Sequence, residues 1–490
     1  MRLRSDALAH LAADIERPRY DREAVRVGIV HLGIGAFHRA HQAVYVDDRL
    51  AAGERDWAIC GASLRSPDTR DALRPQDGLY TLAVRSGGGE RLRIVGSVRD
   101  LLVAPENPEA LLCAMSDPAV RIVSLTVTEK GYCHDPATGR LKEDHPDIVA
   151  DLTDPSRPRS APGFLVEALR RRRESGVAPF TVLCCDNLPA NGHTVRQVVT
   201  GFAALRDRDL GRWIEDQVAF PSTMVDRIVP ATTDEDRAAI AARLGVGDAW
   251  PVVTEPFSQW VIEDRFASGR PRLEDAGAEL VADVAPYELM KLRLLNGSHS
   301  TLAYLGYLAG YETIADTMAD PAFARLVKGL MDDEVTPTLR VPPGADLGGY
   351  KASLLERFAN PALKHRTWQI AMDGSQKLPQ RLLGTVRDRL RAGAPIGRLA
   401  LGIAGWMRYA TGVDERGRPI DVRDPLSERL LRIGRESGLV AERLAPAYLH
   451  IREIFGDDLP ADPRFAEPVT RALAALMQSG AKRTVAGLSV

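Results

Sequence analysis

Apolar residues follow two different patterns along this chain, and the pattern changes near residue 285. Before that point, short apolar runs alternate with helix-length segments, which is typical of an α/β protein with a parallel sheet. Beyond it, strand-like runs become scarce and helical periodicity dominates. We therefore expect two domains: an α/β, Rossmann-type domain over residues 1–285 and a mostly α-helical domain over residues 286–490.

The short apolar runs of the first part are the predicted strands. They are Val27–Leu32, Trp57–Gly61, Val120–Thr128, Phe180–Cys185, Met224–Ile228 and Pro251–Pro256. The runs Leu79–Val84 and Arg91–Val98 flank a glycine-rich turn, so we expect a hairpin added to the same sheet. In the second part the predicted helices are Met290–Leu308, Pro321–Met331, Tyr350–Phe358, Pro379–Arg391, Gly397–Tyr409, Ser427–Ser437 and Pro468–Ser479.

A glycine turn follows the first predicted strand and precedes a predicted helix over Ala36–Ala52. Gly33 permits the tight turn, and Gly35 lets backbone amides approach a pyrophosphate at a helix N-terminus. His38 stands where the usual G-x-G-x-x-G fingerprint has its third glycine. The pattern favours a dinucleotide site, and the alternative is an ordinary strand-to-helix turn.

Charged residues follow two of the predicted strands. Asp68 is the acid placed to accept hydrogen bonds from adenosine ribose hydroxyls and to repel a 2′-phosphate, while Arg65 acts in the opposite direction. We therefore expect NAD rather than NADP. Glu129 and Lys130 fall at the carboxyl end of a strand, where ligands of open α/β sheets bind. The alternative for this pair is a salt bridge on a surface loop.

Asn187 ends the apolar run Phe180–Cys185 and precedes a Leu-Pro turn. An amide at this position can hold a substrate oxygen, although an asparagine that only forms the turn has the same pattern. Asp226 lies inside the later run Met224–Ile228 and belongs to the same group of embedded acids.

One segment at the start of the helical part combines apolar and polar positions in a way that indicates chemistry. At about 100° per residue, four polar side chains share one face. They are Glu288, Lys291, Asn296 and His299. Burial favours the neutral form of a lysine, and a neutral amine can accept a proton from a substrate hydroxyl. The alternative is a Lys–Glu pair at the edge of a solvated face.

Composition excludes several classes of protein. With 64 basic and 66 acidic residues the net charge is -2, which gives no general attraction to nucleic acid or to an anionic membrane. No apolar run approaches the ~18 residues of a membrane span, so we expect a cytoplasmic protein. The five cysteines and ten histidines show no zinc-ligand spacing. We expect reduced thiols and no metal.

Four motifs occur in order along the chain: Gly33–Gln42, Cys185–Gly192, Met224–Ile228 and Lys291–His299. Together they resemble the polyol-specific long-chain dehydrogenases, a family with mannitol 2-dehydrogenase, D-arabinitol dehydrogenase and fructuronate reductase among its members. The resemblance implies an N-terminal Rossmann-type domain, a mostly helical C-terminal domain, a nicotinamide cofactor and chemistry without zinc.

The resemblance also implies roles for individual residues. Lys291 would be the general base, with Asn187 and Asn296 donating hydrogen bonds to the oxygen on the reacting carbon. His299 would orient a neighbouring hydroxyl, and Glu288 would pass the proton to solvent. Asp226 would belong to the polar network around the substrate. The residues expected at the cofactor are Gly33, Gly35, Phe37, Asp68 and Glu129.

The substrate stays open within the family. Glu129-Lys130-Gly131 resembles the fructuronate reductase version, and Gln369 stands where mannitol-type members carry an arginine. A sugar acid needs a cation for its carboxylate, and Lys130 is the best candidate, with Arg366 and Lys377 as helpers. We favour interconversion of D-mannonate and D-fructuronate, with D-mannitol or D-arabinitol as alternatives.

Two readings from other classes remain, an inactive nucleotide-binding sensor and a metal-dependent alcohol dehydrogenase. A small molecule is the expected partner, and the sequence leaves a monomer and a dimer equally open.

Overall fold

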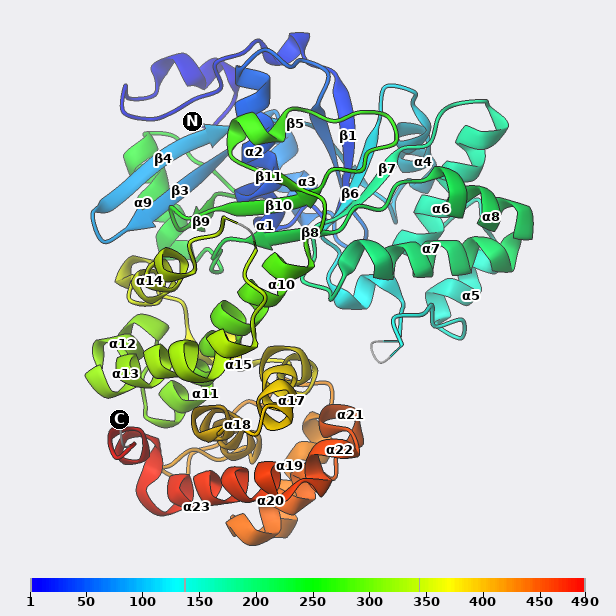
Figure 1. Cartoon of the computed structure of the whole chain (residues 1–490). Helices are drawn as coiled ribbons and strands as arrows, with labels where there is room; N and C mark the ends of the chain where they lie inside the picture. Colours follow the sequence, from blue (N-terminus) through cyan, green and yellow to red (C-terminus); the bar gives the residue numbers. More distant parts are fainter. Residues whose placement is uncertain (1, 136–137, 343, 489–490) are drawn as a thin grey trace. The chain divides into compact units, whose positions relative to one another are not determined.

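The computed structural model describes residues 2–135, 138–342 and 344–488 (Figure 1). The chain divides into two compact units, Met1–Ala285 and Pro286–Val490, which are described separately below as unit 1 and unit 2. Among the described residues, no helix has both the length and the apolar character needed to cross a membrane.

A five-stranded parallel sheet forms the centre of unit 1, with the strand order β5-β2-β1-β6-β7. Its strands are β1 (Val27–Leu32), β2 (Ala58–Ser63), β5 (Val98–Val103), β6 (Ile122–Leu125) and β7 (Thr181–Cys184). The strands are buried and mostly apolar, as expected of a parallel sheet with helices on both faces. The order reverses between β1 and β6, and ligands of such sheets bind beyond the strand ends at this reversal.

Helices connect the strands of unit 1. They are α1 (Ala36–Ala40), α2 (Gln42–Ala51), α3 (Asp68–Leu73), α4 (Pro108–Ser116), α5 (Pro146–Thr153), α6 (Ala161–Glu174), α7 (Asn191–Arg206), α8 (Arg208–Gln217) and α9 (Asp234–Leu244). The single helix expected over Ala36–Ala52 is interrupted at His41, where φ is -122° and ψ is -92°. At this interruption the His41 ring donates a hydrogen bond from Nε2 to the Gln259 carbonyl oxygen at 2.9 Å.

The predicted hairpin forms, but its assignment to the parallel sheet is wrong. Strands β3 (Tyr80–Ser86) and β4 (Gly89–Val95) pair with each other, and β3 also pairs with β9 (Val252–Thr254), in a separate three-stranded sheet. One face of this sheet packs with Ile240 from α9, and the other face joins the core that contains Ile29 and Ile59 of the central sheet, so the hairpin covers the central sheet instead of extending it. A further sheet contains β8 (Thr223–Asp226), β10 (Gln259–Glu263) and β11 (Glu279–Val281).

Unit 2 is built from helices. They are α10 (Ala285–Lys291), α11 (Ser298–Leu308), α12 (Ile314–Ala319), α13 (Pro321–Gly329), α14 (Leu347–Phe358), α15 (Thr367–Ala371), α16 (Gly374–Leu378), α17 (Gly384–Arg391), α18 (Gly397–Ala410), α19 (Ser427–Ser437), α20 (Ala441–Leu449), α21 (Arg452–Phe455), α22 (Asp458–Ala461) and α23 (Pro463–Ala486). Helix α11 is buried along most of its length and packs on α18, which in turn packs on α23 (Figure 1). The predicted fold class, a Rossmann-type α/β domain with a mostly helical second domain, is confirmed.

Candidate functional site

The glycine turn after β1 has the geometry of a phosphate cradle. Gly33 has φ +93°, and a Cβ at this position would lie 2.1 Å from the Thr126 carbonyl oxygen. A larger residue therefore cannot replace it without moving the end of β6. A Cβ on Gly35 would meet only the Gly33 oxygen, at 3.8 Å, so the space beside this residue is open. The turn thus leaves room for a ligand to approach its backbone amides.

A chain of hydrogen bonds that begins at the carbonyl of Gly33 holds this carbonyl in place. Thr126 Oγ1 donates to that carbonyl at 2.7 Å, so the same oxygen accepts from His31 Nε2 at 2.8 Å. His31 Nδ1 in turn accepts from Ser124 Oγ at 2.8 Å. Burial lowers the pKa of His31 to about 3. The His38 ring stacks on it with centroids 3.4 Å apart. The imidazole is therefore neutral, and it acts as a fixed support for the turn.

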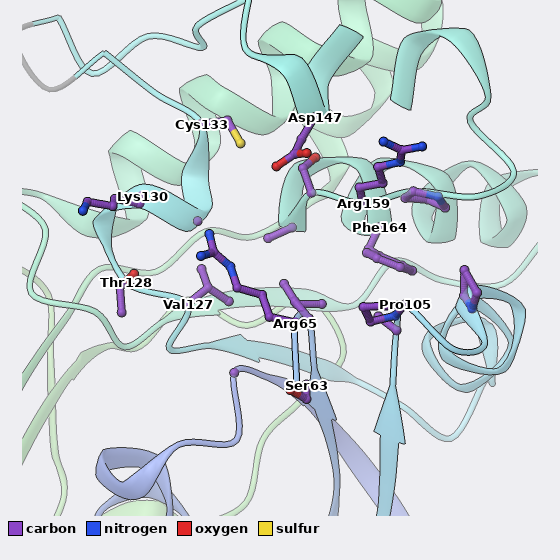
Figure 2. Close-up of a pocket in the computed structure, with 18 of the residues that line it drawn as sticks. Ser63, Arg65, Pro105, Val127, Thr128, Lys130, Cys133, Asp147, Arg159 and Phe164 are labelled. Carbon is purple, nitrogen blue, oxygen red and sulfur yellow. The ribbon is translucent and has the colours of Figure 1, made fainter. Parts of the chain in front are cut away.

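A cavity of about 770 Å³ opens beside this turn (Figure 2). Its wall includes the glycine turn, the end of β2, the start of α3, the loop after β6, and α6 with the segment before it: Gly33, Gly35, Ser63, Arg65, Thr69, Thr128, Lys130, Arg157, Arg159 and Phe164. Lys130 is exposed and shares this cavity with the glycine turn. Asp68, the expected ribose ligand, is the exposed first residue of α3 and is absent from the described residues that line the cavity.

Asp186 holds the loop that carries Glu129 and Lys130, a role that sequence reasoning missed. Its carboxylate accepts from Val127 N at 2.9 Å, from Thr128 N at 3.2 Å and from the Tyr132 hydroxyl at 2.7 Å. Thr128 has φ +64° and ψ 163°, a conformation that costs a non-glycine residue about 1–3 kcal/mol. These bonds offset that strain. Desolvation raises the pKa of Asp186 to about 6, and its hydrogen bonds limit the rise.

Asn191 joins the loop after β7 to β8 through hydrogen bonds of its side-chain amide. Its amide nitrogen donates to the carbonyls of Asp186 at 3.0 Å and Thr223 at 2.9 Å, and its oxygen accepts from Thr223 N at 2.9 Å. The loop between β7 and α7, which contains the exposed Asn187, is therefore tied to β8. Asp226 is the last residue of β8 and is buried. The predicted roles of Asn187 and Asp226 stay predictions.

In unit 2, the segment between α10 and α11 is a π-helix, η6 (Leu292–Gly297). Residues five apart are bonded in such a turn, so Lys291 and Asn296 come into line. In an uninterrupted α-helix they would be about 140° apart. Lys291, Asn296 and His299 are 6%, 8% and 6% exposed. The structure therefore brings these three predicted residues together as a buried polar stripe, with half-buried Glu288 one turn earlier.

His299 is a neutral imidazole in a positively charged environment. Its pKa is held well below the usual range, first by desolvation and then by the neighbouring charges of His365, Arg381, Arg357 and Lys377. Its ring contacts those of His365, at 4.7 Å between centroids, and Phe358. His299 Nε2 is buried and has no hydrogen-bond partner among the described residues. A substrate hydroxyl could supply that partner.

Lys377 and Arg366, the two cations that the sequence analysis expects to help Lys130 bind a carboxylate, lie in different surroundings. Lys377 Nζ donates to the Met372 carbonyl at 2.5 Å and contributes to the field at His299. The Arg366 side chain is 46% exposed and lies 3.4 Å from the Glu312 carboxylate. Of the two, Lys377 is therefore the one that the structure links to the polar stripe.

One trio of possible metal ligands occurs within the described part of the chain: Cys133, His145 and Asp147, with ligand atoms within 4.8 Å of one another. Burial raises the pKa of the Cys133 thiol to about 12. His145 Nδ1 already accepts from Asp147 N at 3.2 Å as the cap of α5. A protonated thiol and an occupied ring nitrogen are poor ligands.

The strand order and the glycine turn define a Rossmann-type, dinucleotide-binding class of domain. Family models described as the mannitol dehydrogenase Rossmann domain and the mannitol dehydrogenase C-terminal domain match residues 27–275 and 283–477. The chain therefore belongs to the mannitol dehydrogenase family, which confirms the resemblance seen in the sequence. It is a dehydrogenase acting on a CH–OH group.

Individual relatives cover nearly the whole chain. The chain is 51% identical to the D-mannonate oxidoreductase of Escherichia coli (strain K12), over 97% of this chain and 98% of the relative. It is 44% identical to the mannitol 2-dehydrogenase of Aspergillus terreus, over 99% and 98% of the two chains. The structure of Pseudomonas fluorescens mannitol 2-dehydrogenase in ternary complex with NAD and D-mannitol superposes with a TM-score of 0.92, at 42% identity and 99% coverage of both chains.

Replacing Asp186 by Asn should change how stability depends on pH. A carboxyl with a raised pKa in the folded state stabilises the fold most below about pH 4, and this contribution falls as pH rises to about 6. The free energy of unfolding of the wild type, minus that of Asp186→Asn, should therefore decrease over this range and be constant above it. Denaturant titrations at several pH values measure this, with the exposed Asp216→Asn as control. A flat difference would contradict the raised pKa.

Replacing Gly297 by Ala should destabilise unit 2. A Cβ there would lie 2.8 Å from the Arg381 carbonyl oxygen, in the second π-helical segment η10 (Pro379–Leu383), so the backbone must shift. Overpacking of this kind costs about 1–3 kcal/mol. Gly384→Ala is the matched control, because its Cβ would meet nothing closer than 3.6 Å. Equal melting temperatures for the two variants would show that η6 tolerates the side chain.

Proposed function

We propose that the chain oxidises a secondary alcohol of a sugar acid to a ketone with NAD, interconverting D-mannonate and D-fructuronate. The observation that carries the proposal is the polar stripe of Lys291, Asn296 and His299, aligned by a π-turn on a buried helix. A buried amine, amide and imidazole in one row are costly unless they are used.

The residues of unit 1 fit a dinucleotide. Gly33 forms the tight turn, Gly35 leaves open space beside backbone amides, and the adjoining cavity is lined by Arg65, Lys130 and Arg159. Such a wall suits an anionic pyrophosphate. Of the further predicted contacts, Phe37 stacks with His41, at 5.1 Å between ring centroids, and Glu129 lies in the loop after β6. When bound, NAD supplies the carbon that accepts a hydride.

The chain's own residues manage the proton and the developing charge. Lys291 accepts the hydroxyl proton, and Glu288 passes it to solvent. Asn296 donates to the oxygen on which negative charge grows, a role that the family resemblance also implies for Asn187. His299, being neutral, orients a neighbouring hydroxyl through Nε2, and Asp226 belongs to the surrounding polar network.

Charge near the stripe supports a sugar acid as the substrate. Arg381, Arg357 and Lys377 act together on His299, and a carboxylate is the substrate group that such a field favours. The identity of 51% to a D-mannonate oxidoreductase points the same way. D-Mannitol is the second candidate, because the superposed Pseudomonas enzyme is a mannitol 2-dehydrogenase.

The direct test is NAD reduction by the purified chain with D-mannonate, D-mannitol and D-arabinitol side by side. The highest kcat/KM is expected for D-mannonate. A preference for D-mannitol would transfer the assignment to the second candidate, and absence of turnover with all three would favour the inactive nucleotide-binding sensor.

Replacing Lys291 by Ala should lower kcat by about 10²–10⁴-fold, the usual contribution of a general base. The affinity for NAD, measured by calorimetry, should stay unchanged. Lys328→Ala is the matched control, because this lysine of unit 2 is exposed and pairs with Asp332 at 2.5 Å. Near-normal turnover of Lys291→Ala would make Lys291 a structural residue.

Replacing Lys130 by Ala tests whether this cation recognises the substrate's carboxylate. A hydrogen bond between charged groups contributes about 1.5–3 kcal/mol, so kcat/KM for D-mannonate should fall by about 10–100-fold while D-mannitol is little affected. Lys142→Ala, an exposed lysine of the following loop, is the control. Equal losses on both substrates would place Lys130 at the cofactor, whose cradle shares its cavity.

A further inference from the structure

We propose that His365 is a further substrate-binding residue, and that its imidazole binds a hydroxyl group of the substrate beside the hydroxyl that His299 orients. The proposal rests on the proposed function, because it concerns the substrate of the same polar stripe. It adds to that function a second imidazole and the chemical group that this imidazole recognises, one of two neighbouring hydroxyls on a polyol or sugar-acid chain.

His365 lies next to His299 in the fold. It precedes α15, and α15 packs on α11, the helix that carries His299 (Figure 1). The centroids of the two imidazole rings are 4.7 Å apart, with an angle of 69° between the ring planes. Phe358, at the end of α14, also contacts the His299 ring, with centroids 5.2 Å apart. Of these two neighbours, His365 is the one whose ring nitrogens can form hydrogen bonds to a ligand.

The backbone around His365 is held by hydrogen bonds in which its side chain takes no part. The His365 carbonyl accepts from Ile314 N at 2.9 Å, and Thr367 N donates to the Glu312 carbonyl at 2.9 Å. Thr367 Oγ1 also donates to the Tyr311 carbonyl at 3.0 Å. These bonds tie the segment to the residues at the start of α12 and leave Nδ1 of the ring unused. A side chain presented by a fixed backbone is suited to binding a ligand.

Each of the two touching rings has a nitrogen that lacks a hydrogen bond. His365 Nδ1 and His299 Nε2 are both shielded from solvent, and neither has a partner among the described residues. A buried polar atom without a partner is costly. One ligand with hydroxyls on adjacent carbons would supply both partners at once. Polyols and sugar acids are ligands of this kind.

The charge state of the rings favours a hydroxyl over a carboxylate at this position. Desolvation, followed by the charge of Lys377, lowers the pKa of His365 to about 4. Desolvation also lowers the pKa of His299. Both imidazoles are therefore neutral, and a neutral imidazole donates from one nitrogen and accepts at the other, as a hydroxyl both donates and accepts. A carboxylate only accepts, so it suits the nearby cations Arg381 and Arg357 better than either ring.

The test compares two variants of nearly equal shape, His365→Leu and His365→Asn. The Asn side chain keeps a polar amide close to the place of Nδ1, whereas the Leu side chain has no polar atom. On D-mannonate, His365→Leu should raise KM and lower kcat/KM by about 10-fold, the value of one hydrogen bond, while kcat changes little. His365→Asn should keep most of the wild-type kcat/KM. His365→Leu should lose the same factor on D-mannitol, because the hydroxyl chain is common to both substrates.

Analogues of D-mannonate that each lack one hydroxyl would identify the bound group. For one of them, the wild type should lose about the same factor in kcat/KM as His365→Leu loses on D-mannonate. On that analogue the wild type and His365→Leu should be equally efficient, because the contact is already absent. A series in which every analogue shows the full effect of His365→Leu would overturn the proposal.

His450→Leu is the matched control, because this exposed histidine of unit 2 donates from Nδ1 to the Pro446 carbonyl at 2.6 Å and should be replaceable without loss of turnover. Circular dichroism checks folding, and His365→Phe takes the place of His365→Leu if the latter does not fold. Wild-type efficiency of the Leu variant, or equal losses in the Leu and Asn variants, would overturn the proposal alone.

The outcomes for the proposed function are separate. A wild-type preference for D-mannitol would correct the substrate assignment, and the loss in His365→Leu on both substrates would still support the role of His365. Absence of wild-type turnover with D-mannonate, D-mannitol and D-arabinitol would overturn the proposed function and this proposal with it.

Discussion

The alignment of the polar side chains in unit 2 depends on η6, a π-helical turn that contains about one residue more than an α-helical turn. Lys291 and Asn296 are five residues apart, and the i→i+5 bonding of η6 brings them closer to one line than the about 140° of an uninterrupted α-helix. Gly297 makes this possible, because its missing side chain lets the Arg381 carbonyl of η10 approach. The two π-helical segments pack on each other, and η6 continues into α11, which is buried along most of its length.

Desolvation then decides the charge state of the imidazoles. His31 and His38 beneath the glycine turn and His299 in the stripe are all neutral for the same reason, which is burial. For His299 the surrounding cations add to the effect. A neutral ring can both donate and accept hydrogen bonds, so it can orient a hydroxyl.

Apolar runs were sufficient to locate β1, β2, β6 and β7 to within a few residues, because a buried parallel strand has to be apolar throughout. The helical period led to Lys291, Asn296 and His299 as part of one polar face, and the family resemblance then gave them roles. The rest depended on information that local patterns lack. The hairpin's partner β9 lies about 170 residues further along the chain. A π-turn has the same composition as an α-turn, and Asp186 shows its role only through the three donors around it.

Two segments of the cavity wall are held in the same way, each by a carboxylate that accepts hydrogen bonds from backbone amides. Asp186 uses its carboxylate on backbone amides of the loop that carries Lys130, and the buried Asp151 accepts from the amides of Arg159 and Ser160, at 2.7 and 3.0 Å. In both cases a carboxylate fixes a segment through its backbone instead of pairing with the segment's cation. The segment is held in place, and its positive side chain stays unpaired. The cavity wall therefore combines fixed backbone segments with four cationic side chains and two carboxylates, Asp147 and Asp154, and this excess of positive charge suits an anionic ligand.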